Sequence, residues 1–396
     1  MHTILFDDFQ RLDFLPLAYT RPIGALRFGI ATLSEKWQWL LNNPVSFHTE
    51  HYLQEKFPLL CEPNSLWINA RAIPNLQIRE SLLQLNPGEG FGSKSSPIAF
   101  RTSNIPEQGL SLNEIVESIN FKEIEAPAKM LENITDLFSL NHEAIAYDFH
   151  TLTANKISAK LSQTCTVIGD PALVFVGQNV VAEGAYFNTT GGPIYLANNS
   201  EVMEGSVLRG PIALCEHATI KAGSKIYGAT TIGPHCKVGG EVSNSLLMGF
   251  SNKGHDGFLG NSVLGEWCNL GADTNTSNLK NNYSEVKIWN YASRRMSNSG
   301  LTFCGLIMGD HSKCGINTMF NTGTTAGVAA NIFGGGFPSK FIPSFTWGGA
   351  DGTETYDFHK AMMTAERVMA RRHIDLTEQD IAVLRHIFES TETFRS

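Results

Sequence analysis

A histidine and several lysines stand in two polar segments whose side chains could carry out chemistry. Residues 251–261 (SNKGHDGFLGN) place Lys253 and His255 among glycines, and residues 276–283 (TSNLKNNY) are rich in asparagine. A histidine side chain titrates near neutrality and can accept a proton, whereas lysine ammonium groups bind phosphate oxygens through charge-assisted hydrogen bonds. A loop histidine is also often solvated and without a role, so the residue types alone leave both interpretations open.

Both segments interrupt a six-residue repeat that must position them. Apolar residues recur at every sixth position in three runs: Val202, Leu208, Leu214, Ile220, Ile226, Ile232 and Val238; Phe258, Leu264 and Leu270; Met308, Cys314, Phe320, Ala326 and Ile332. Helices bury residues with a period of 3.6 and ordinary strands with a period of two, so a period of six indicates short strands joined by tight turns in stacked coils. The repeat breaks across residues 243–257 and 275–303, where we expect functional loops. His217, His235 and His311 lie between inward positions, and we expect them to be solvated.

Composition and charge limit the classes of partner. The chain has 396 residues, 42% of them hydrophobic, which is enough for two or three domains with a sizeable core. Its net charge of -8 argues against nucleic acid, whereas a phosphorylated small molecule needs only a local cluster of cations. Seven cysteines without a CxxC pair indicate reduced thiols. With no secretory-signal pattern and no run of about 18 apolar residues, we expect a cytoplasmic protein without a membrane span.

The repeat and the polar segments together resemble a known family. The hexapeptide pattern is similar to that of the hexapeptide acyltransferases. The lysine and histidine before Phe258-Leu-Gly, then residues 269–272 (NLGA), then an Asn-Tyr pair resemble the acetyltransferase domain of the bifunctional N-acetylglucosamine-1-phosphate uridyltransferase / glucosamine-1-phosphate acetyltransferase family. The resemblance implies a left-handed parallel β-helix, a homotrimer, and acetyl transfer from acetyl-CoA to a glucosamine-1-phosphate-like amino sugar. It also implies that His255 is the general base.

The same resemblance implies further site residues. Phe258 replaces a family tyrosine, and the family Asn-Tyr pair matches either Asn278 by distance or Asn282 and Tyr283 by identity. The expected substrate-binding residues in the β-helix region are Arg209, Lys253, Asn278, Lys280, Asn282, Tyr283 and Lys287. Residues 336–342 (GFPSKFI) resemble a loop that lies near coenzyme A in hexapeptide acetyltransferases, which implies that Ser339 and Lys340 bind this cosubstrate.

The N-terminal half resembles a second kind of enzyme. Residues 16–22 (PLAYTRP) resemble the Pro-Leu-Thr-x-x-Arg-Pro segment of sugar-1-phosphate nucleotidyltransferases, which implies that Arg21 binds substrate. The glycine-rich phosphate loop that precedes this segment in those enzymes is replaced by residues 6–11 (FDDFQR). The half looks like the shortened N-terminal region of a Bacteroidetes-type branch of the bifunctional family. Asp7 and Asp8 are candidate Mg²⁺ ligands if this half is active; otherwise they belong to a turn after the first strand.

These observations predict a mixed fold in three parts. We expect an α/β nucleotidyltransferase-like domain over residues 1–150, a left-handed parallel β-helix over residues 151–336, and an exit loop with C-terminal helices over residues 337–396. The C-terminal helices are expected to cover the open end of the β-helix, because an uncovered sheet edge invites aggregation. We also expect a helix over residues 33–41 and another within residues 354–372, with Arg367, Arg371 and Arg372 on its outer face. Thr377 is the expected N-cap of the last helix.

Two alternative functions stay open beside acetyl transfer. One is a sugar-1-phosphate nucleotidyltransferase that uses UTP or dTTP, with the β-helix as an oligomerisation platform. The other is a non-catalytic scaffold whose sites have decayed. In either catalytic case the expected partner is a phosphorylated amino sugar or a sugar nucleotide.

Overall fold

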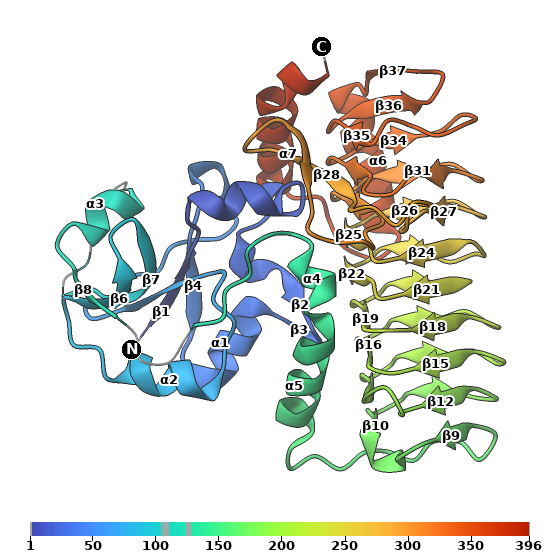
Figure 1. The fold of residues 1–396 in the computed structure, drawn as a ribbon, viewed down its shortest axis with the longest axis horizontal. Coiled ribbons are helices and arrows are strands. Elements are labelled where there is room, and N and C mark those ends of the chain that lie inside the picture. Colours follow the sequence, from blue (N-terminus) through green and yellow to red (C-terminus); the bar gives the residue numbers. More distant parts are fainter. Residues whose placement is uncertain (1, 104, 106–110, 124–127, 396) are drawn as a thin grey trace. The chain divides into compact units, whose positions relative to one another are not determined.

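The first part of the chain folds around a mixed β-sheet (Figure 1). The computed structural model describes residues 2–103, 105, 111–123 and 128–395, and one compact unit lies within residues 2–14, 20–26 and 31–134. Its sheet has the order β4-β1-β5-β7-β6-β8, in which β1, β4 and β5 are parallel and β7 is antiparallel to its neighbours. The strands are β1 (Thr3–Phe6), β4 (Val45–His48), β5 (Leu66–Asn69), β6 (Glu89–Ser93), β7 (Ser96–Arg101) and β8 (Asn120–Lys122).

Aromatic packing and helix caps hold this unit together. The rings of Trp67 and Phe100 are stacked with centroids 5.3 Å apart, and both side chains are fully buried. The expected first helix is α1 (Leu33–Leu41), which begins at a Thr32–Glu35 capping box. The other helices of this unit are α2 (Leu76–Leu83) and α3 (Leu112–Val116).

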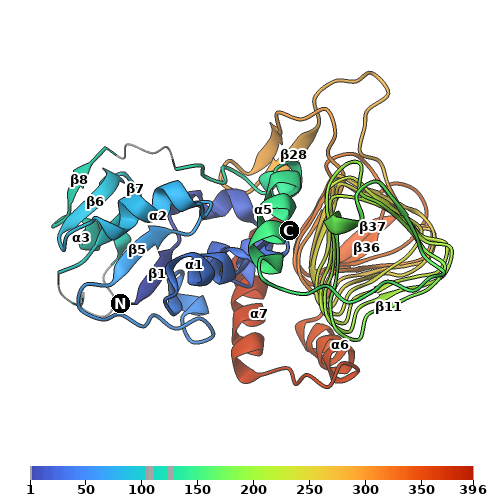
Figure 2. The same cartoon turned by 90° about the horizontal axis from the view of Figure 1, so that it is seen from below.

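The second unit is a parallel β-helix, as the six-residue repeat predicts. It comprises residues 15–19, 27–30 and 135–395. Its coils stack into a prism with three faces, and strands of successive coils pair in parallel, except that the last strand of the third face pairs antiparallel with the strand before it (Figures 1 and 2). The α/β region followed by a left-handed β-helix and C-terminal helices confirms the expected fold class.

Each face of the prism is one sheet. The first face has β9 (Thr166–Ile168), β12 (Tyr186–Asn188), β15 (Val207–Arg209), β18 (Lys225–Tyr227), β21 (Glu241–Ser243) and β24 (Phe258–Gly260), and β27 (Asn275–Thr276) pairs with β32 (Met319–Phe320). The second face has β10 (Val174–Val176), β13 (Ile194–Leu196), β16 (Ile212–Leu214), β19 (Thr230–Ile232), β22 (Leu246–Gly249), β25 (Val263–Glu266), β30 (Ile307–Met308), β33 (Thr325–Ala326) and β35 (Phe341–Ile342). The third face has β11 (Val181–Ala182), β14 (Glu201–Val202), β17 (Thr219–Ile220), β20 (Lys237–Val238), β23 (Asn252–Lys253), β26 (Asn269–Leu270), β31 (Lys313–Cys314), β34 (Asn331–Ile332), β36 (Thr346–Gly349) and β37 (Gly352–Thr355).

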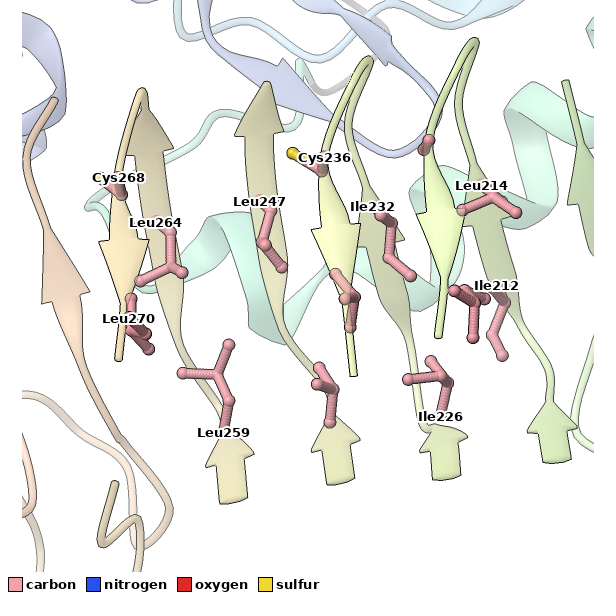
Figure 3. Close-up of a cluster of buried hydrophobic side chains, with 14 of the residues drawn as sticks. Ile212, Leu214, Ile226, Ile232, Cys236, Leu247, Leu259, Leu264, Cys268 and Leu270 are labelled. Carbon is pink, nitrogen blue, oxygen red and sulfur yellow. The ribbon is translucent and has the colours of Figure 1, made fainter. Parts of the chain in front are cut away.

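The repeated apolar residues point into the prism and form its core (Figure 3). All of the expected inward positions are buried except Phe258, which is half-buried. The inward residue of β24 is Leu259, because it pairs with the buried Val242 while Phe258 pairs with Glu241 on the outer surface. The corner between β24 and β25 is one residue shorter than a strict period of six requires.

The two breaks in the repeat have different structural causes. Across residues 243–257 the coil continues through β22 and β23 without an inserted loop, and Lys253 occupies an inward position because it pairs with Val238. The second break is a true insertion, since the chain leaves the coil after Thr276 and returns at β30. This insertion carries the antiparallel hairpin of β28 (Lys287–Asn290) and β29 (Arg295–Asn298).

Segments from outside the repeat cover the second face. Helix α5 (Asn141–Thr153), preceded by α4 (Asp136–Ser139), packs through Ile145 and Phe149 in one cluster with Phe175. Asn141 donates a 2.9 Å hydrogen bond to the backbone oxygen of Ala229. These helices therefore belong to the β-helix unit, whereas the sequence suggested a boundary at residue 150.

The C-terminal helices pack beside the coils. Helix α6 (Phe358–Ala370) lies alongside the prism (Figure 2), and α7 (Glu378–Ser390) begins at the expected N-cap, Thr377. Phe388 of α7 packs edge-on against Phe345 of the last coil, with ring centroids 5.1 Å apart. The expectation that the whole tail covers the open end is wrong for α6, whose apolar stripe packs against the side of the coils. Within the described residues, the helices lack the length and hydrophobicity needed to cross a bilayer.

Candidate functional site

A cavity of about 830 Å³ lies between the third face of the β-helix and helix α6. Its volume falls in the range of small-molecule sites, roughly 300–1,000 Å³. Its polar and charged lining residues are Lys221, Lys237, Asn252, His255, Asn269, Lys313, Thr364, Arg371 and Arg372. The remaining lining residues are Phe250, Gly254, Trp267, Cys268, Leu270, Gly271, Ala272, Ile316 and Val368.

The β-helix supplies one wall of this cavity as a single column of side chains. Lys237, Asn252, Asn269 and Lys313 pair in successive coils, and each directly precedes an inward residue of its strand. Neighbouring side chains in a strand point to opposite faces, so this column faces outward toward the cavity. The six-residue register could have identified Lys237, Asn269 and Lys313 from sequence, because each comes one position before the apolar series. Asn252 precedes Lys253, which lies outside that series.

Helix α6 supplies the opposite wall through Thr364, Val368, Arg371 and Arg372. A guanidinium nitrogen of Arg372 donates to the backbone oxygen of His235 at 3.3 Å and lies 3.5 Å from Oδ1 of Asn252. These contacts connect the end of α6 to the coils. The sequence placed both arginines on the outer face of a helix, but only packing of α6 on the β-helix shows that they line a cavity.

His255 lines this cavity and is exposed to solvent. It follows β23 in the turn that leads back to the first face of the β-helix. The ring is thus accessible to a molecule bound in the cavity, which is the first requirement for a group that exchanges protons with a substrate.

Lys253 holds the turn that carries His255. It is buried, with 2% of its surface exposed, and its ammonium group donates to the backbone oxygens of Gly239 at 3.0 Å, Asp256 at 3.1 Å, and His255. Burial lowers the pKa of Lys253 to about 8, while Asp256 and Asp273 oppose that shift. The sequence placed Lys253 among the substrate-binding residues, but its inward position directs its ammonium group to the turn and not to the cavity.

A stack of aromatic rings borders the cavity at the corner between the second and third faces. His217, His235, Phe250, Trp267 and His311 follow each other in successive coils, with centroids 4.2 to 6.3 Å apart and nearly parallel rings. All five have positive φ angles, between 55° and 61°. The expectation of solvated histidines is wrong for His235 and His311, which are half-buried in this stack, whereas His217 is exposed.

The remaining residues expected in the β-helix site lie outside the cavity lining. Arg209 is exposed on the first face, and Asn278 donates to Asn261 Oδ1 at 2.8 Å. Four residues lie in the insertion that contains β28: Lys280, Asn282, Tyr283 and Lys287. Among them, Lys280 donates to the backbone oxygen of Glu285, and Tyr283 is 70% exposed.

The expected coenzyme A loop lies near the insertion. Lys340 donates to Thr322 Oγ1 at 3.1 Å, and Ser339 is exposed. The pKa of Lys340 is lowered by burial and by the positive charge of Lys280. The structure thus brings Lys340 and Lys280 together, but at a place separate from the lining of the His255 cavity.

The two N-terminal aspartates form ion pairs with arginines. Asp8 accepts from Arg71 at 2.7 Å and from Asn69 at 2.8 Å. Asp7 lies 3.4 Å from Arg11 and accepts from Thr49 and from the backbone of Ile23, and burial raises its pKa to about 6. Both carboxylates are thus engaged by cations and donors of the chain itself, and their role as Mg²⁺ ligands stays a prediction.

Arg21 is buried in the same unit, with 7% of its surface exposed. Its guanidinium group lies 3.5 Å from Thr20 Oγ1. No group of three or more histidine, cysteine, aspartate or glutamate side chains in the described ranges is arranged to hold a metal ion.

Comparison with known proteins finds one matching family model and several similar curated proteins. Residues 3–157 match a family model described as sugar nucleotidyl transferase. The chain is 37% identical over 87 residues to the bifunctional protein GlmU of Methanocaldococcus jannaschii, covering 22% of this chain and 21% of that protein. It is 34% identical over 102 residues to a bifunctional sugar-1-phosphate nucleotidylyltransferase/acetyltransferase of Sulfurisphaera tokodaii, covering 26% and 25%.

A longer and weaker similarity extends over more of the chain. The bifunctional protein GlmU of Synechococcus elongatus is 26% identical over 183 residues, which cover 45% of this chain and 35% of that protein. The matched segments thus span between about a fifth and about a third of these curated relatives.

Proposed function

Because the chain fits the GlmU-like family, with a sugar nucleotidyl transferase region and a hexapeptide β-helix, we propose that it is an acetyltransferase acting on an amino sugar 1-phosphate. The acetyl donor is acetyl-CoA and the acceptor resembles glucosamine 1-phosphate. His255 is the general base. The observation that carries the proposal is the position of His255 on the wall of the cavity between the third face and α6.

The reaction needs one proton acceptor beside the amine. The amine nitrogen attacks the thioester carbonyl carbon, a C–N bond forms, the C–S bond breaks, and the thiolate of coenzyme A leaves. The nitrogen must lose a proton as the amide forms, and an imidazole that titrates near neutrality accepts it efficiently. The backbone bonds of Lys253 hold the turn and so keep His255 at the cavity.

Replacement of His255 tests this proposal. We expect His255→Ala to lower the rate of acetyl transfer to glucosamine 1-phosphate about 100-fold or more, because general bases contribute roughly 10²–10⁴-fold. The matched control is His359→Ala, which replaces an exposed histidine outside the cavity lining. Full activity of His255→Ala, with the purified chain and a thiol-release assay, would reject His255 as the base.

Nucleotidyl transfer is a second candidate function, favoured by the family match over residues 3–157. The test is pyrophosphate release from UTP or dTTP with a panel of sugar 1-phosphates. Pyrophosphate release with any sugar 1-phosphate supports this second activity, and no release with all of them rejects it. If both assays are silent and neither acetyl-CoA nor sugar nucleotides raise the melting temperature, the chain is a scaffold.

A further inference from the structure

Five cationic side chains face the cavity without a carboxylate partner. Lys221, Lys237, Lys313, Arg371 and Arg372 line it, and no aspartate or glutamate does. In the part of the chain that the structure describes, none of the five forms an ion pair. The chain as a whole carries a net charge of -8, so this cluster of one sign runs against its overall composition.

Carboxylates are available elsewhere in the same β-helix. On the first face, Lys225 lies 3.5 Å from Glu241 in an ion pair. Along the cavity, the column on the third face instead places two asparagines between Lys237 and Lys313, and asparagine is a neutral donor and acceptor. The lack of carboxylates is therefore a property of the cavity lining and not of the whole solenoid. Glu201, which lies two strands before Lys237 in the same column, is outside that lining.

Helix position alone explains only part of the cluster. Arg371 and Arg372 come directly after the last residue of α6, where the negative end of the helix dipole favours cations. The three lysines belong to the opposite wall and have no such explanation. Burial lowers the pKa of Lys237, and the charges of Arg372, Lys221 and Arg371 lower it further. The cations thus repel each other across the cavity until a negative charge is bound.

Lys313 lies in the β-helix wall of the cavity, where it can contribute to ligand binding. Its ammonium group donates to the backbone oxygen of His311 at 2.7 Å, which leaves further N–H groups for a ligand. Burial lowers the pKa of Lys313 to about 8, so it is still mainly charged at neutral pH. A bound phosphate would add an opposite charge and raise that pKa.

We propose that this cavity binds the phosphate groups of a ligand that carries at least one phosphate monoester or diphosphate, and that α6 is part of the binding site. Lysine and arginine hold phosphoryl oxygens through charge-assisted hydrogen bonds, and five cations suit more than one phosphate group. The ligand's identity as a substrate of acetyl transfer rests on the proposed function, since His255 lines the same cavity. Phosphate binding itself does not depend on that function.

The phosphate has two possible sources, which a binding experiment separates. Adenosine 3′,5′-bisphosphate and pyrophosphate represent the phosphates of coenzyme A, and glucosamine 1-phosphate represents the acceptor. Each is titrated by calorimetry into the full chain at low and at moderate ionic strength. Tight binding of the bisphosphate assigns the cavity to the acyl donor, and tight binding of the sugar phosphate assigns it to the acceptor; either result supports the proposal.

Two variants on opposite walls test the assignment. We expect Arg371→Ala/Arg372→Ala to weaken binding of the preferred ligand about tenfold or more, because hydrogen bonds to charged groups are worth roughly 1.5–3 kcal/mol. Lys237→Gln should weaken it too, and Lys237→Arg should restore part of it. Arg367→Ala is the matched control, since Arg367 is exposed on α6 outside the cavity lining.

The result that overturns the proposal differs from failure of acetyl transfer. Wild-type binding that is unchanged in both Arg371→Ala/Arg372→Ala and Lys237→Gln, or no binding of any of the three probes, rejects the phosphate site. Phosphate binding without acetyl transfer would reject the proposed function and leave the phosphate site in place.

Discussion

A single lysine at an inward position links the core of the β-helix to the candidate site. Lys253 stands where the neighbouring coils have Val238 and Leu270. A buried ammonium group is costly unless its donors are satisfied, and here three backbone oxygens of the adjoining turns satisfy them. Lys253 is therefore a positioning residue for the turn that carries His255.

Lys253→Met keeps the chain length of this side chain and removes its donors. We expect acetyl transfer to fall, because the turn that carries His255 loses its three contacts. Since the folded-state pKa of about 8 lies below the ordinary 10.5, the unfolded chain binds more protons between these values. The free energy of unfolding therefore rises with pH from about 8 to 10.5 in the wild type. Lys253→Met should lose its share of that rise, measured by urea unfolding at several pH values.

Part of the pH dependence of the free energy of unfolding should remain in Lys253→Met because of Lys313. Its pKa is also lowered to about 8 by burial, so its share of the rise stays in Lys253→Met. The control is Lys225→Met, because the Lys225 side chain is 61% exposed. An unchanged pH profile together with unchanged acetyl transfer in Lys253→Met would contradict the positioning role.

The stack of rings at one corner is the clearest feature at the scale of elements. Left-handed backbone is unfavourable for bulky residues, and asparagine is the usual choice at such corners, as at Asn179 and Asn199 in the first coils. From His217 to His311 the same corner carries rings instead. Stacking between rings offsets the backbone cost, because aromatic pairs add roughly 0.5–1.5 kcal/mol beyond the area they bury. The stack also forms one edge of the cavity through Phe250 and Trp267.

Trp267 is the ring whose loss should matter most. It is 6% exposed, its ring centroid lies 4.2 Å from that of Phe250, and its φ angle is 61°. We expect Trp267→Ala to lower the free energy of unfolding by about 3–5 kcal/mol, as for other buried tryptophans. Urea unfolding followed by circular dichroism measures the change.

An exposed tryptophan serves as the comparison for this loss. Trp39 of α1 is 41% exposed, so Trp39→Ala should change the free energy of unfolding by no more than about 1 kcal/mol. Equal stability losses in the two variants would contradict a stabilising role of the buried, stacked Trp267.

At the scale of the whole molecule, the β-helix unit draws on the N-terminal part of the chain. Thr231 donates to the backbone oxygen of Gly29 at 2.9 Å, and Asp148 accepts from the backbone of Ile30 at 2.8 Å. Residues 27–30 thus belong to the β-helix unit although they lie near the start of the sequence. A fragment cut at residue 150 would lack these residues and α5. The homotrimer implied by the family resemblance stays a prediction.

The sequence by itself determined the features that depend on local or periodic order. A residue pattern with a period of six has one compact solution, in which strands stack and bury the repeated side chains. Helix α1 and the N-cap Thr377 follow from local preferences, and the structure has both where the sequence predicts them. His255 could be singled out because it stands next to a break in the repeat.

Only the tertiary structure decided which side chains meet at the candidate site. Lys221 and Arg372 line one cavity although about 150 residues separate them, because α6 packs against the third face. The inward position of Lys253 depends on corner lengths that vary by one or two residues from coil to coil, so a strict count of six does not reveal it. The spacing of apolar residues identifies the coils. The packing of α6 on the coils leaves no periodic pattern in the sequence, because it depends on the shapes of the two folded surfaces.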